Sequence, residues 1–414
     1  MREITLQQVL DARERRVERQ RRLLVSFKKP LLVLNMNIAG PLKRGGLIDF
    51  AFFEGVRALD RVLGERVVER ELTDELTGLE YVWVCDMSGE ELKDIAVREE
   101  TAAPIGRLYD LDVIGLDGMK YSRGTPRECI VCGGPVGVCS RSRAHGLPAI
   151  VEATNARLLD FAAERLAELG VQALISEVDL TPKPGLVDRR NSGAHSDMDI
   201  EMFYRSAECL RGYFERAVRL GAETDDCMKA LQQAGLDAEQ TMFAVTGGVN
   251  THKGAIYAFG LVLAALGARM VRGGDVFERA AELAKQGVPP QNTHGQQVKA
   301  KYTAGGARAE AFAGFPHARA AQKLMHEDGG DGTRAFLHLM SVVEDTNVLY
   351  RGGREGLEFL QSESARILSK TPREYITELQ KLDDECIKRN LSPGGSADII
   401  ALTYLLNSTR EIWH

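Results

Sequence analysis

The 414-residue chain has no excess of basic residues, since 53 Lys and Arg stand against 59 Asp and Glu and the net charge is −6. Nucleic-acid-binding proteins usually contain a strongly basic domain, so the sequence argues against that class. The chain also has no apolar run that approaches the roughly 18 residues of a membrane-spanning helix. Its first residues contain no apolar signal core. We therefore expect a cytoplasmic protein with no nucleic-acid or membrane partner.

Cysteine is scarce and odd in number. The seven cysteines lie in a long chain without an export signal, so reduced thiols are the expected state. Apolar residues make up 44% of the chain and charged residues 27%, which is typical of a globular protein. At roughly 150 residues per domain, the length predicts two or three domains.

The two halves of the chain differ in the secondary structure that their sequences predict. Residues 1–146 combine one basic helix with short strand-like runs and predict an α+β domain, whereas residues 155–414 show helix after helix and predict an all-α domain. The boundary is expected near 146–154. In the first half, strands are expected at 31–36, 67–72, 81–86 and 108–114, and helices at about 5–25 and 48–63. In the second half, helices are expected near 155–169, 201–220, 254–269, 275–286, 333–349, 355–368, 373–389 and 396–408. Gly170 stands where a helix C-cap belongs.

The first expected helix carries six arginines on its polar face: Arg13, Arg15, Arg16, Arg19, Arg21 and Arg22. A solvated helix face is the simplest interpretation. The alternative is a docking surface for an acidic partner protein.

The clearest chemical signal of the first half is Asp110-Leu-Asp112 within an apolar strand-like run. In a strand, these two side chains point to the same face. Two carboxylates so placed can share Mg²⁺ and hold a triphosphate against a nucleophile. An exposed Asp-x-Asp loop without function is the alternative.

Further along, Arg141 and Arg143 could face one way and bind phosphates, or could be two surface arginines. Cys129, Cys132, Cys139 and His145 have a spacing that could hold zinc. They lack the doubled CxxC of a strong zinc signature, so the favoured interpretation is that these thiols are buried and free. The sequence leaves the question open.

The runs LLVLNMNIAGP (31–41), GRLYDLDV (106–113), PRECIVC (126–132) and CSRSRAHG (139–146) occur in the order seen in apo-citrate lyase phosphoribosyl-dephospho-CoA transferase, also called holo-citrate lyase synthase. Residues 1–146 thus resemble that family. The resemblance implies a nucleotidyltransferase-like domain, in which a serine of the citrate lyase acyl carrier protein (the gamma subunit) attacks a phosphate and pyrophosphate leaves. Asp110 and Asp112 match the metal-binding pair of that chemistry. Lys43-Arg-Gly-Gly46 departs from the expected linker and receives no role.

The second half concentrates polar residues in four Gly-rich junctions at the ends of apolar helices. The first, TPKPGLVDRRNSGAHSDMD (181–199), contains Lys183, Asp188, Asn191, His195, Asp197 and Asp199. The second, TGGVNTHKG (246–254), contains Asn250, Thr251, His252 and Lys253, and could cradle a phosphate at a helix N-terminus. It is not a Walker A motif.

The third junction, DTNVLYRGG (345–353), contains Asp345, Asn347 and Arg351, and the fourth, RNLSPGGSAD (389–398), contains Ser392, Gly394, Gly395 and Asp398. Ser396 could cap the last helix. Capping loops with solvated charges are the structural alternative for these segments. Four such junctions favour one shared pocket, because loops on a rigid scaffold often carry function.

Together these junctions resemble triphosphoribosyl-dephospho-CoA synthase over roughly 155–414. The resemblance implies that ATP and dephospho-CoA are joined and that adenine is released. Cleavage of an N-glycosidic bond builds positive charge on the ribose, which carboxylates stabilise. Asp188, Asp197 or Asp199 could act as the base, with His195 beside them. Mg²⁺, held by Asp197 and Asp199, together with Lys183, Lys253 and backbone N–H groups would bind the triphosphate.

Three alternatives remain open at this point. The pair of activities could serve malonate decarboxylase, which carries the same prosthetic group. The first half could be a non-catalytic module that docks the carrier. The second half could be a helical small-molecule kinase, which would release ADP rather than adenine from ATP.

Overall fold

A computed structural model describes residues 4–103, 105–124, 126–287 and 306–413, and the chain divides into two compact units, Met1–Ala162 and Ala163–His414. The division falls within one long helix, α5 (Leu147–Asp179). The predicted boundary near 146–154 lies at the start of that helix.

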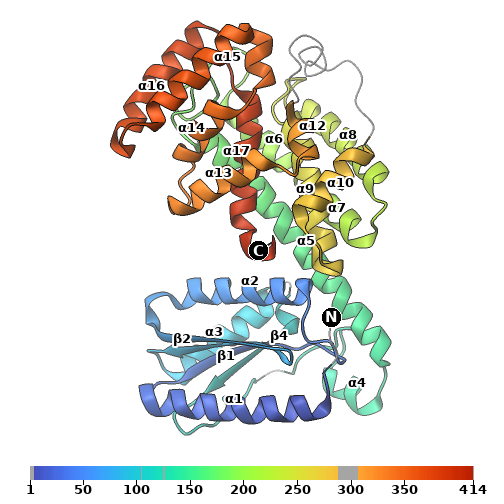
Figure 1. Ribbon diagram of the computed structural model, residues 1–414. Helices are drawn as coiled ribbons and strands as arrows, with labels where there is room; N and C mark the ends of the chain where they lie inside the picture. The colour runs from blue at the N-terminus through green and yellow to red at the C-terminus, as the bar shows by residue number, and fades with distance from the viewer. Residues whose placement is uncertain (1–3, 104, 125, 288–305, 414) are drawn as a thin grey trace. The chain divides into compact units, whose positions relative to one another are not determined.

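Unit 1 is built on a four-stranded antiparallel sheet in the order β2-β3-β1-β4 (Figure 1). The strands are β1 (Leu31–Met36), β2 (Val67–Glu75), β3 (Gly78–Cys85) and β4 (Tyr109–Ile114). The helices are α1 (Leu6–Phe27), α2 (Gly46–Leu63), α3 (Gly89–Ala102) and α4 (Val136–Ser142), with 3₁₀ turns η1 (Gly64–Arg66) and η2 (Gly106–Leu108). The expected mixture of helix and strand is confirmed, and α3 and α4 are additions that the sequence did not predict.

Alternation along the central strand β1 places helices on both faces of the sheet. Leu32 and Leu34 belong to the core beneath α2 and α3, whereas Leu31 and Val33 belong to a smaller core that Leu23 of α1 closes. In Figure 1, α1 runs along one face of the sheet while α2 and α3 cover the other. Because successive strand residues point to opposite faces, the register decides which side chains meet α1.

Among the described residues of unit 2, 163–287 and 306–413, all regular secondary structure is helical, as the sequence predicted. After α5 come α6 (Ile200–Cys209), α7 (Arg211–Glu223), α8 (Met228–Val245), α9 (Lys253–Arg272) and α10 (Val276–Gln286). The remaining helices are α12 (Gly306–Phe312), α13 (Pro316–Glu327), α14 (Thr333–Val342), α15 (Thr346–Leu368), α16 (Pro372–Lys388), α17 (Gly394–Ser408) and α18 (Arg410–Trp413). A non-helical residue, Gly353 with φ +64° and ψ −162°, interrupts α15.

Helix α9 lies at the centre of unit 2 and packs against α7, α8, α10 and α17. By length and composition alone it could cross a membrane, so the expectation that no apolar run approaches that length was wrong. Within the described residues, however, 78% of its most apolar window is buried inside the fold. A helix that is apolar all round and buried by its neighbours is the core helix of a domain.

Two expected helix boundaries were wrong for packing reasons. Gly170 does not end a helix, because α5 continues to Asp179. A Cβ atom at Gly170 would lie 2.8 Å from a ring carbon of Phe214, so this glycine allows α5 and α7 to approach closely. Ser396 does not cap α17, which begins at Gly394. Its hydroxyl donates instead to the carboxylate of Asp345.

Candidate active sites

The two aspartates of β4 lie on the sheet face that α1 covers. Asp110 pairs in register with Asn35 of β1, and Asp112 pairs with Val33, whose side chain belongs to the α1-side core. The predicted placement on one face is therefore confirmed. Their side chains are 44% and 26% exposed, so both carboxylates reach solvent at the edge of a rigid strand.

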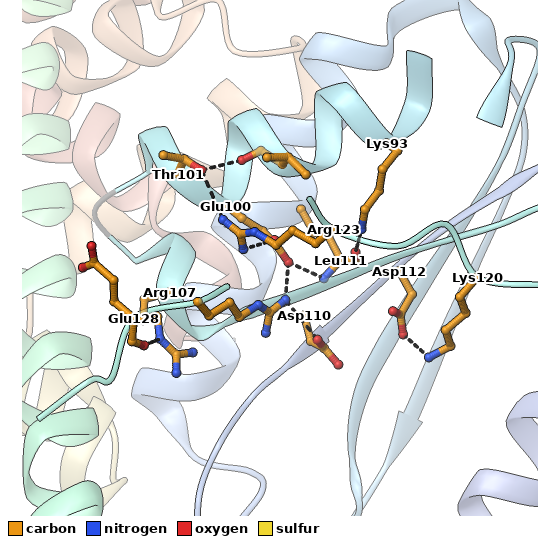
Figure 2. A network of polar contacts seen from close by, with 12 residues as sticks. Lys93, Glu100, Thr101, Arg107, Asp110, Leu111, Asp112, Lys120, Arg123 and Glu128 are labelled. Carbon is orange, nitrogen blue, oxygen red and sulfur yellow. Dashed lines mark hydrogen bonds and ion pairs between the residues drawn. The ribbon is translucent and has the colours of Figure 1, made fainter. Parts of the chain in front are cut away.

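Each of these carboxylates has a cationic partner. Arg127 Nη2 lies 3.1 Å from Oδ1 of Asp110, and Lys120 Nζ lies 2.5 Å from Oδ2 of Asp112. Figure 2 shows both aspartates projecting from β4, with Lys120 reaching Asp112. A group that binds these oxygens must share them with, or displace, two positive charges.

The outer edge of β4 is covered by side chains from α3 (Figure 2). The buried carboxylate of Glu100 accepts the backbone N–H of Leu111 at 2.9 Å and Arg123 Nη1 at 2.8 Å. Lys93 Nζ donates to the Leu111 carbonyl at 3.3 Å. Arg127 also pairs with Glu100 and so bridges this buried acid to Asp110.

Four arginines of α1 pair with polar or acidic residues of the sheet. Arg16 donates to Asn35 Oδ1 at 2.8 Å and pairs with the buried Glu80, and Arg19 lies 2.5 Å from Glu80. Two further pairs are Arg15–Glu75 and Arg22–Glu71. The interpretation as a solvated face was therefore wrong for Arg16 and Arg19, whereas Arg15 and Arg22 stay exposed within their ion pairs. Arg13 and Arg21 are exposed, as are Arg141 in α4 and Arg143 at its C-cap.

In unit 2, the first junction is anchored by buried ion pairs and amides. Lys183, only 1% exposed, pairs with Glu177 of α5, which is 4% exposed. Asp188 accepts the backbone N–H groups of Lys183 at 2.8 Å, Arg190 at 2.7 Å and Asn191 at 3.1 Å. Asp188 thus holds the loop in shape, and its oxygens already serve as acceptors.

Asp383 of α16 binds the same loop from the other side. Its carboxylate accepts Gly185 N–H at 2.9 Å, Asn191 Nδ2 at 2.8 Å and Arg190 Nη1 at 2.8 Å. Asn191, expected to bind substrate, is therefore committed to this contact. Burial raises the pKa of Asp383 although these donors oppose the shift.

His195 joins the first, third and fourth junctions. Arg351 Nη2 lies 3.3 Å from His195 Nδ1, and His195 Nε2 lies 2.8 Å from Ser392 Oγ. A guanidinium only donates, so Nδ1 accepts and Nε2–H donates to Ser392. Burial and the charge of Arg351 lower the pKa of His195, which keeps the ring neutral. Arg351 also donates to Asn390 Oδ1 at 2.9 Å.

Asp345 ties the third junction to the fourth. Its Oδ2 accepts the backbone N–H of Ser396 at 2.7 Å and the Ser396 hydroxyl at 3.0 Å, while Oδ1 accepts the N–H of Asn347 at 2.9 Å. Cβ atoms at Gly394 and Gly395 would lie 2.5 Å from Asn347 Nδ2 and 3.1 Å from Asp345 Oδ2. The two glycines thus leave room for this close approach.

Asp398 meets the start of α9 in the second junction. Its carboxylate accepts the backbone N–H of Ala255, and a Cβ at Gly254 would overlap with it. Burial and the negative charges of Glu177 and Asp345 raise the pKa of Asp398 well above its ordinary value. The helix N-terminus expected to cradle a phosphate therefore already holds a carboxylate.

His252 is a second buried histidine in this region. Its Nδ1 lies 2.7 Å from Ser206 Oγ, which in turn lies 2.6 Å from Thr251 Oγ1. Burial and the positive charge of Lys183 lower the pKa of His252 to about 3. Its Nε2 is buried with no hydrogen-bond partner in the described part of the chain, so this nitrogen is free to bind a ligand.

Other residues expected at this site have local roles. Lys253 Nζ lies 2.7 Å from Glu239 Oε2 of α8, and Asn250 Oδ1 accepts the Lys253 N–H at 3.1 Å. Asp199 caps α6 by accepting the N–H of Met202 at 2.7 Å. Asp197 is exposed and lies 3.9 Å from His195 Nδ1. The structure thus brings together the four junctions but leaves Asp197 and Asp199 at their rim.

Sequence reasoning missed Glu177, Ser206 and Asp383. Each lies within or at the start of a regular helix and interrupts an otherwise ordinary pattern. A polar residue at a core-facing helical position was the available signal. It could not be recognised without knowing which faces are buried.

Comparison with known proteins gives two family matches in chain order. Residues 4–161 match the family described as apo-citrate lyase phosphoribosyl-dephospho-CoA transferase (CitX). Residues 163–414 match the family described as ATP:dephospho-CoA triphosphoribosyl transferase (CitG). The two matches meet where the chain divides into its compact units.

Curated relatives have the same arrangement. Protein CitXG of Haemophilus influenzae is 34% identical, with 98% of this chain and 97% of the relative covered. Protein CitXG of Leuconostoc mesenteroides subsp. cremoris is 31% identical over 97% of both chains. The 2-(5''-triphosphoribosyl)-3'-dephosphocoenzyme-A synthase of Haemophilus ducreyi is 37% identical and covers 66% of this chain, with 97% of its own length matched.

The fold and these matches define a bifunctional transferase with one activity per unit. The chain belongs to the CitXG family of fused proteins, with the phosphoribosyl-dephospho-CoA transferase unit first and the triphosphoribosyl-dephospho-CoA synthase unit second. Both resemblances noted in the sequence are thereby confirmed.

Proposed function

We propose that unit 2 joins ATP to dephospho-CoA at the meeting point of the four junctions, and that unit 1 transfers the product to the citrate lyase acyl carrier protein at the Asp110–Asp112 face. The observation that supports the first assignment most strongly is the raised pKa of Asp398 beside Glu177 and Asp345. A half-buried carboxylate whose pKa is raised in this way is suited to proton transfer.

In unit 2, the 2′-hydroxyl oxygen of dephospho-CoA attacks C1′ of the ATP ribose. The new C–O bond replaces the bond from C1′ to adenine, and the triphosphate remains on the product. The hydroxyl proton passes to the Asp398 carboxylate. Positive charge on the ribose in the transition state is stabilised by the neighbouring carboxylate of Asp345. This assignment replaces Asp188 and Asp199 as the base, because three backbone N–H groups occupy the Asp188 carboxylate and Asp199 is an exposed cap of α6.

The triphosphate and adenine need positive charge and donors. Arg351 and Lys253 supply charge at the rim of the junctions, and His252 Nε2 supplies a buried polar atom without a protein partner in the described chain. Lys183 contributes positive electrostatic potential but no free hydrogen-bond donor to the substrate, because its ammonium is paired with Glu177. Asp197 and Asp199 remain the proposed Mg²⁺ ligands of this unit, and both are exposed.

In unit 1, the carrier serine oxygen attacks the phosphorus next to the added ribose, and pyrophosphate leaves. The oxygen donors of Asp110 and Asp112 fit Mg²⁺, because they share one face and are accessible from solvent. Bound there, Mg²⁺ would neutralise phosphate charge. Arg127, Lys120, Arg141 and Arg143 are the neighbouring or exposed cations that can bind the phosphates. Paired carboxylates on an edge strand of a small sheet support a nucleotidyltransferase-like unit, and a cytoplasmic location fits these substrates.

The test is mass spectrometry of ATP and dephospho-CoA incubated with the full chain, magnesium and the citrate lyase acyl carrier protein. We expect free adenine, a triphosphoribosyl-dephospho-CoA product and a heavier carrier. In Asp398→Asn, adenine should disappear while carrier labelling from supplied intermediate continues. In Asp110→Asn with Asp112→Asn, adenine release should continue while labelling stops. ADP in place of adenine, or labelling by the double variant, contradicts the assignment.

A further inference from the structure

Four potential metal ligands converge in unit 1 within the segment after β4. The ligand atoms of Cys129, Cys132, Cys139 and His145 all lie within 4.8 Å of one another. A tetrahedral zinc ion, with Zn–S about 2.3 Å and Zn–N about 2.0–2.1 Å, separates its ligand atoms by about 3.5–3.8 Å. The sulfurs of Cys132 and Cys139 are already 3.5 Å apart. The four side chains thus need only small adjustments to surround one ion.

The backbone around Cys129 is folded to present its sulfur. Gly133, with φ +72°, donates its N–H to the Cys129 carbonyl at 2.9 Å, and the Cys129 N–H donates to the Gly134 carbonyl at 2.6 Å. This turn places the Cys129 sulfur beside the sulfurs of Cys132 and Cys139. A thiolate is the form of each cysteine that binds a metal.

The other two ligands come from α4 and the turn that follows it. Cys139 lies within α4, and Arg143 ends the helix in a left-handed conformation with φ +52°. The Ala144 N–H then donates back to the Cys139 carbonyl at 3.1 Å, which returns His145 to the cysteines. His145 Nε2 is buried and, among the described residues, has no hydrogen-bond partner. A buried polar atom left unpaired is unfavourable, and a metal bond would offset that cost.

The sequence interpretation of these cysteines as buried free thiols holds only for Cys129. Cys132 is exposed and Cys139 half-buried, so burial in an apolar core does not explain why they gather. A disulfide between Cys132 and Cys139 would leave Cys129 and His145 without partners. A shared ion accounts for all four side chains at once.

We propose that Cys129, Cys132, Cys139 and His145 form a structural zinc site in unit 1. Three thiolates and one neutral imidazole complete a four-ligand shell, which leaves no open position for substrate or water. Binding releases the thiol protons to solvent and changes no oxidation state. The site would stabilise the segment after β4 that carries the four ligands.

The metal also holds Arg127 in place, a consequence that rests on the proposed role of Asp110. The N–H of Val136 donates to the Arg127 carbonyl at 3.1 Å, and Arg107 Nε donates to the Glu128 carbonyl at 2.5 Å. These contacts lie immediately before the first metal ligand. Zinc therefore fixes the hydrogen-bonded backbone at Arg127 and Glu128, from which the Arg127 side chain reaches Asp110 and Glu100.

The primary test is zinc content of the full chain purified without chelators under reducing conditions. We expect one equivalent of zinc per chain. Cobalt exchanged into the site should show the intense absorption of a tetrahedral cobalt–thiolate centre. Cys132→Ser and His145→Ala should lose the metal, whereas His145→Cys should keep it. Cys209→Ser, in unit 2, is the matched control and should be unchanged.

Wild-type protein decides the question even if a variant fails to fold. Zinc-free chain that takes up no zinc after full reduction overturns the proposal, as does full zinc retention by both Cys132→Ser and His145→Ala. A Cys132–Cys139 disulfide in protein that binds no zinc after reduction also overturns it. Limited trypsin digestion gives a readout independent of activity. After chelation, cleavage at Arg123 or Arg127 should accelerate, while unit 2 fragments appear at their former rate. Absence of carrier labelling alone would count against the proposed function and not against the metal.

Discussion

Gly254 at the start of α9 directly faces the carboxylate of Asp398 in α17, and a side chain at position 254 would overlap with that carboxylate. Gly254→Ala should therefore displace Asp398 from the Ala255 N–H. We expect adenine release to fall about 100-fold, the size of effect that follows a misplacement of about 1 Å. Gly212→Ala is the control, because a Cβ there meets nothing within 4 Å. Full activity of Gly254→Ala would show that the position of Asp398 is unimportant.

Asp398 also predicts a pH dependence. A base must be ionised, so adenine release should be lost as pH falls through the raised pKa of Asp398, at a pH above the usual aspartate value of about 3.9. The measurement is kcat/KM for adenine release against pH. Asp398→Asn should lower the rate by about 10²–10⁴-fold and remove this acid limb. An unchanged limb in the variant would assign it to another group.

His252 predicts an acid sensitivity of the folding of unit 2. The pKa of His252 is lowered to about 3 in the folded chain, whereas an unfolded histidine titrates near 6.5. Between these values the unfolded state binds the proton and the folded state does not, so stability falls with falling pH by about 1.4 kcal/mol per unit. His252→Gln should show a shallower decline between about pH 7 and pH 5 in urea unfolding. The exposed His326→Gln should decline like wild type.

Asp383 and Asp384 provide a matched pair of neighbours. Asp383 accepts three donors of the 183–191 loop, whereas Asp384 is 58% exposed and pairs only at the surface with Arg190. Asp383→Ala should destabilise unit 2 by about 3–5 kcal/mol, because it leaves a partly buried cation and amides unpaired. Asp384→Ala should cost under about 1 kcal/mol. Equal effects in chemical denaturation would refute this role.

Lys120 tests the metal assignment in unit 1. If Asp112 binds Mg²⁺, removing the competing ammonium should ease metal binding. Lys120→Ala should lower the Mg²⁺ concentration for half-maximal carrier labelling by up to about 5-fold, the limit set by an exposed ion pair of about 1 kcal/mol. Lys29→Ala, which breaks the pair with Asp86, is the control. A raised Mg²⁺ requirement in Lys120→Ala would indicate that Lys120 binds phosphate instead.

The elements with strong local signals were predictable. The strand β1 was expected at 31–36 and spans Leu31–Met36, because a run of Leu and Val buried on both faces marks a central strand. The convergence of the four junctions was also predicted, because loops on a rigid scaffold often carry function. Several of their polar residues nevertheless have structural roles, as Asp188 and Asp199 show. His195, Arg351 and Ser392 meet accordingly.

What failed depended on tertiary contact. Acidic residues on β2 and β3 form ion pairs with the α1 arginines, and a helical sequence pattern does not reveal such partners. Glycine is common at helix ends, yet Gly170 lies within α5 and packs against the ring of Phe214. Asp188 looked like a catalytic base by position, but three backbone N–H groups occupy its carboxylate. Hydrogen-bond partners cannot be read from residue type alone.

The helix α5 has a practical implication. Leu158 and Phe161 pack into the core of the first unit, while Gly170, roughly two and a half to three turns later, packs on Phe214 in the second. Cutting the gene between the two activities would therefore either remove core side chains from the first unit or leave them exposed on the second. Each unit encoded separately would therefore need its own copy of this stretch of α5.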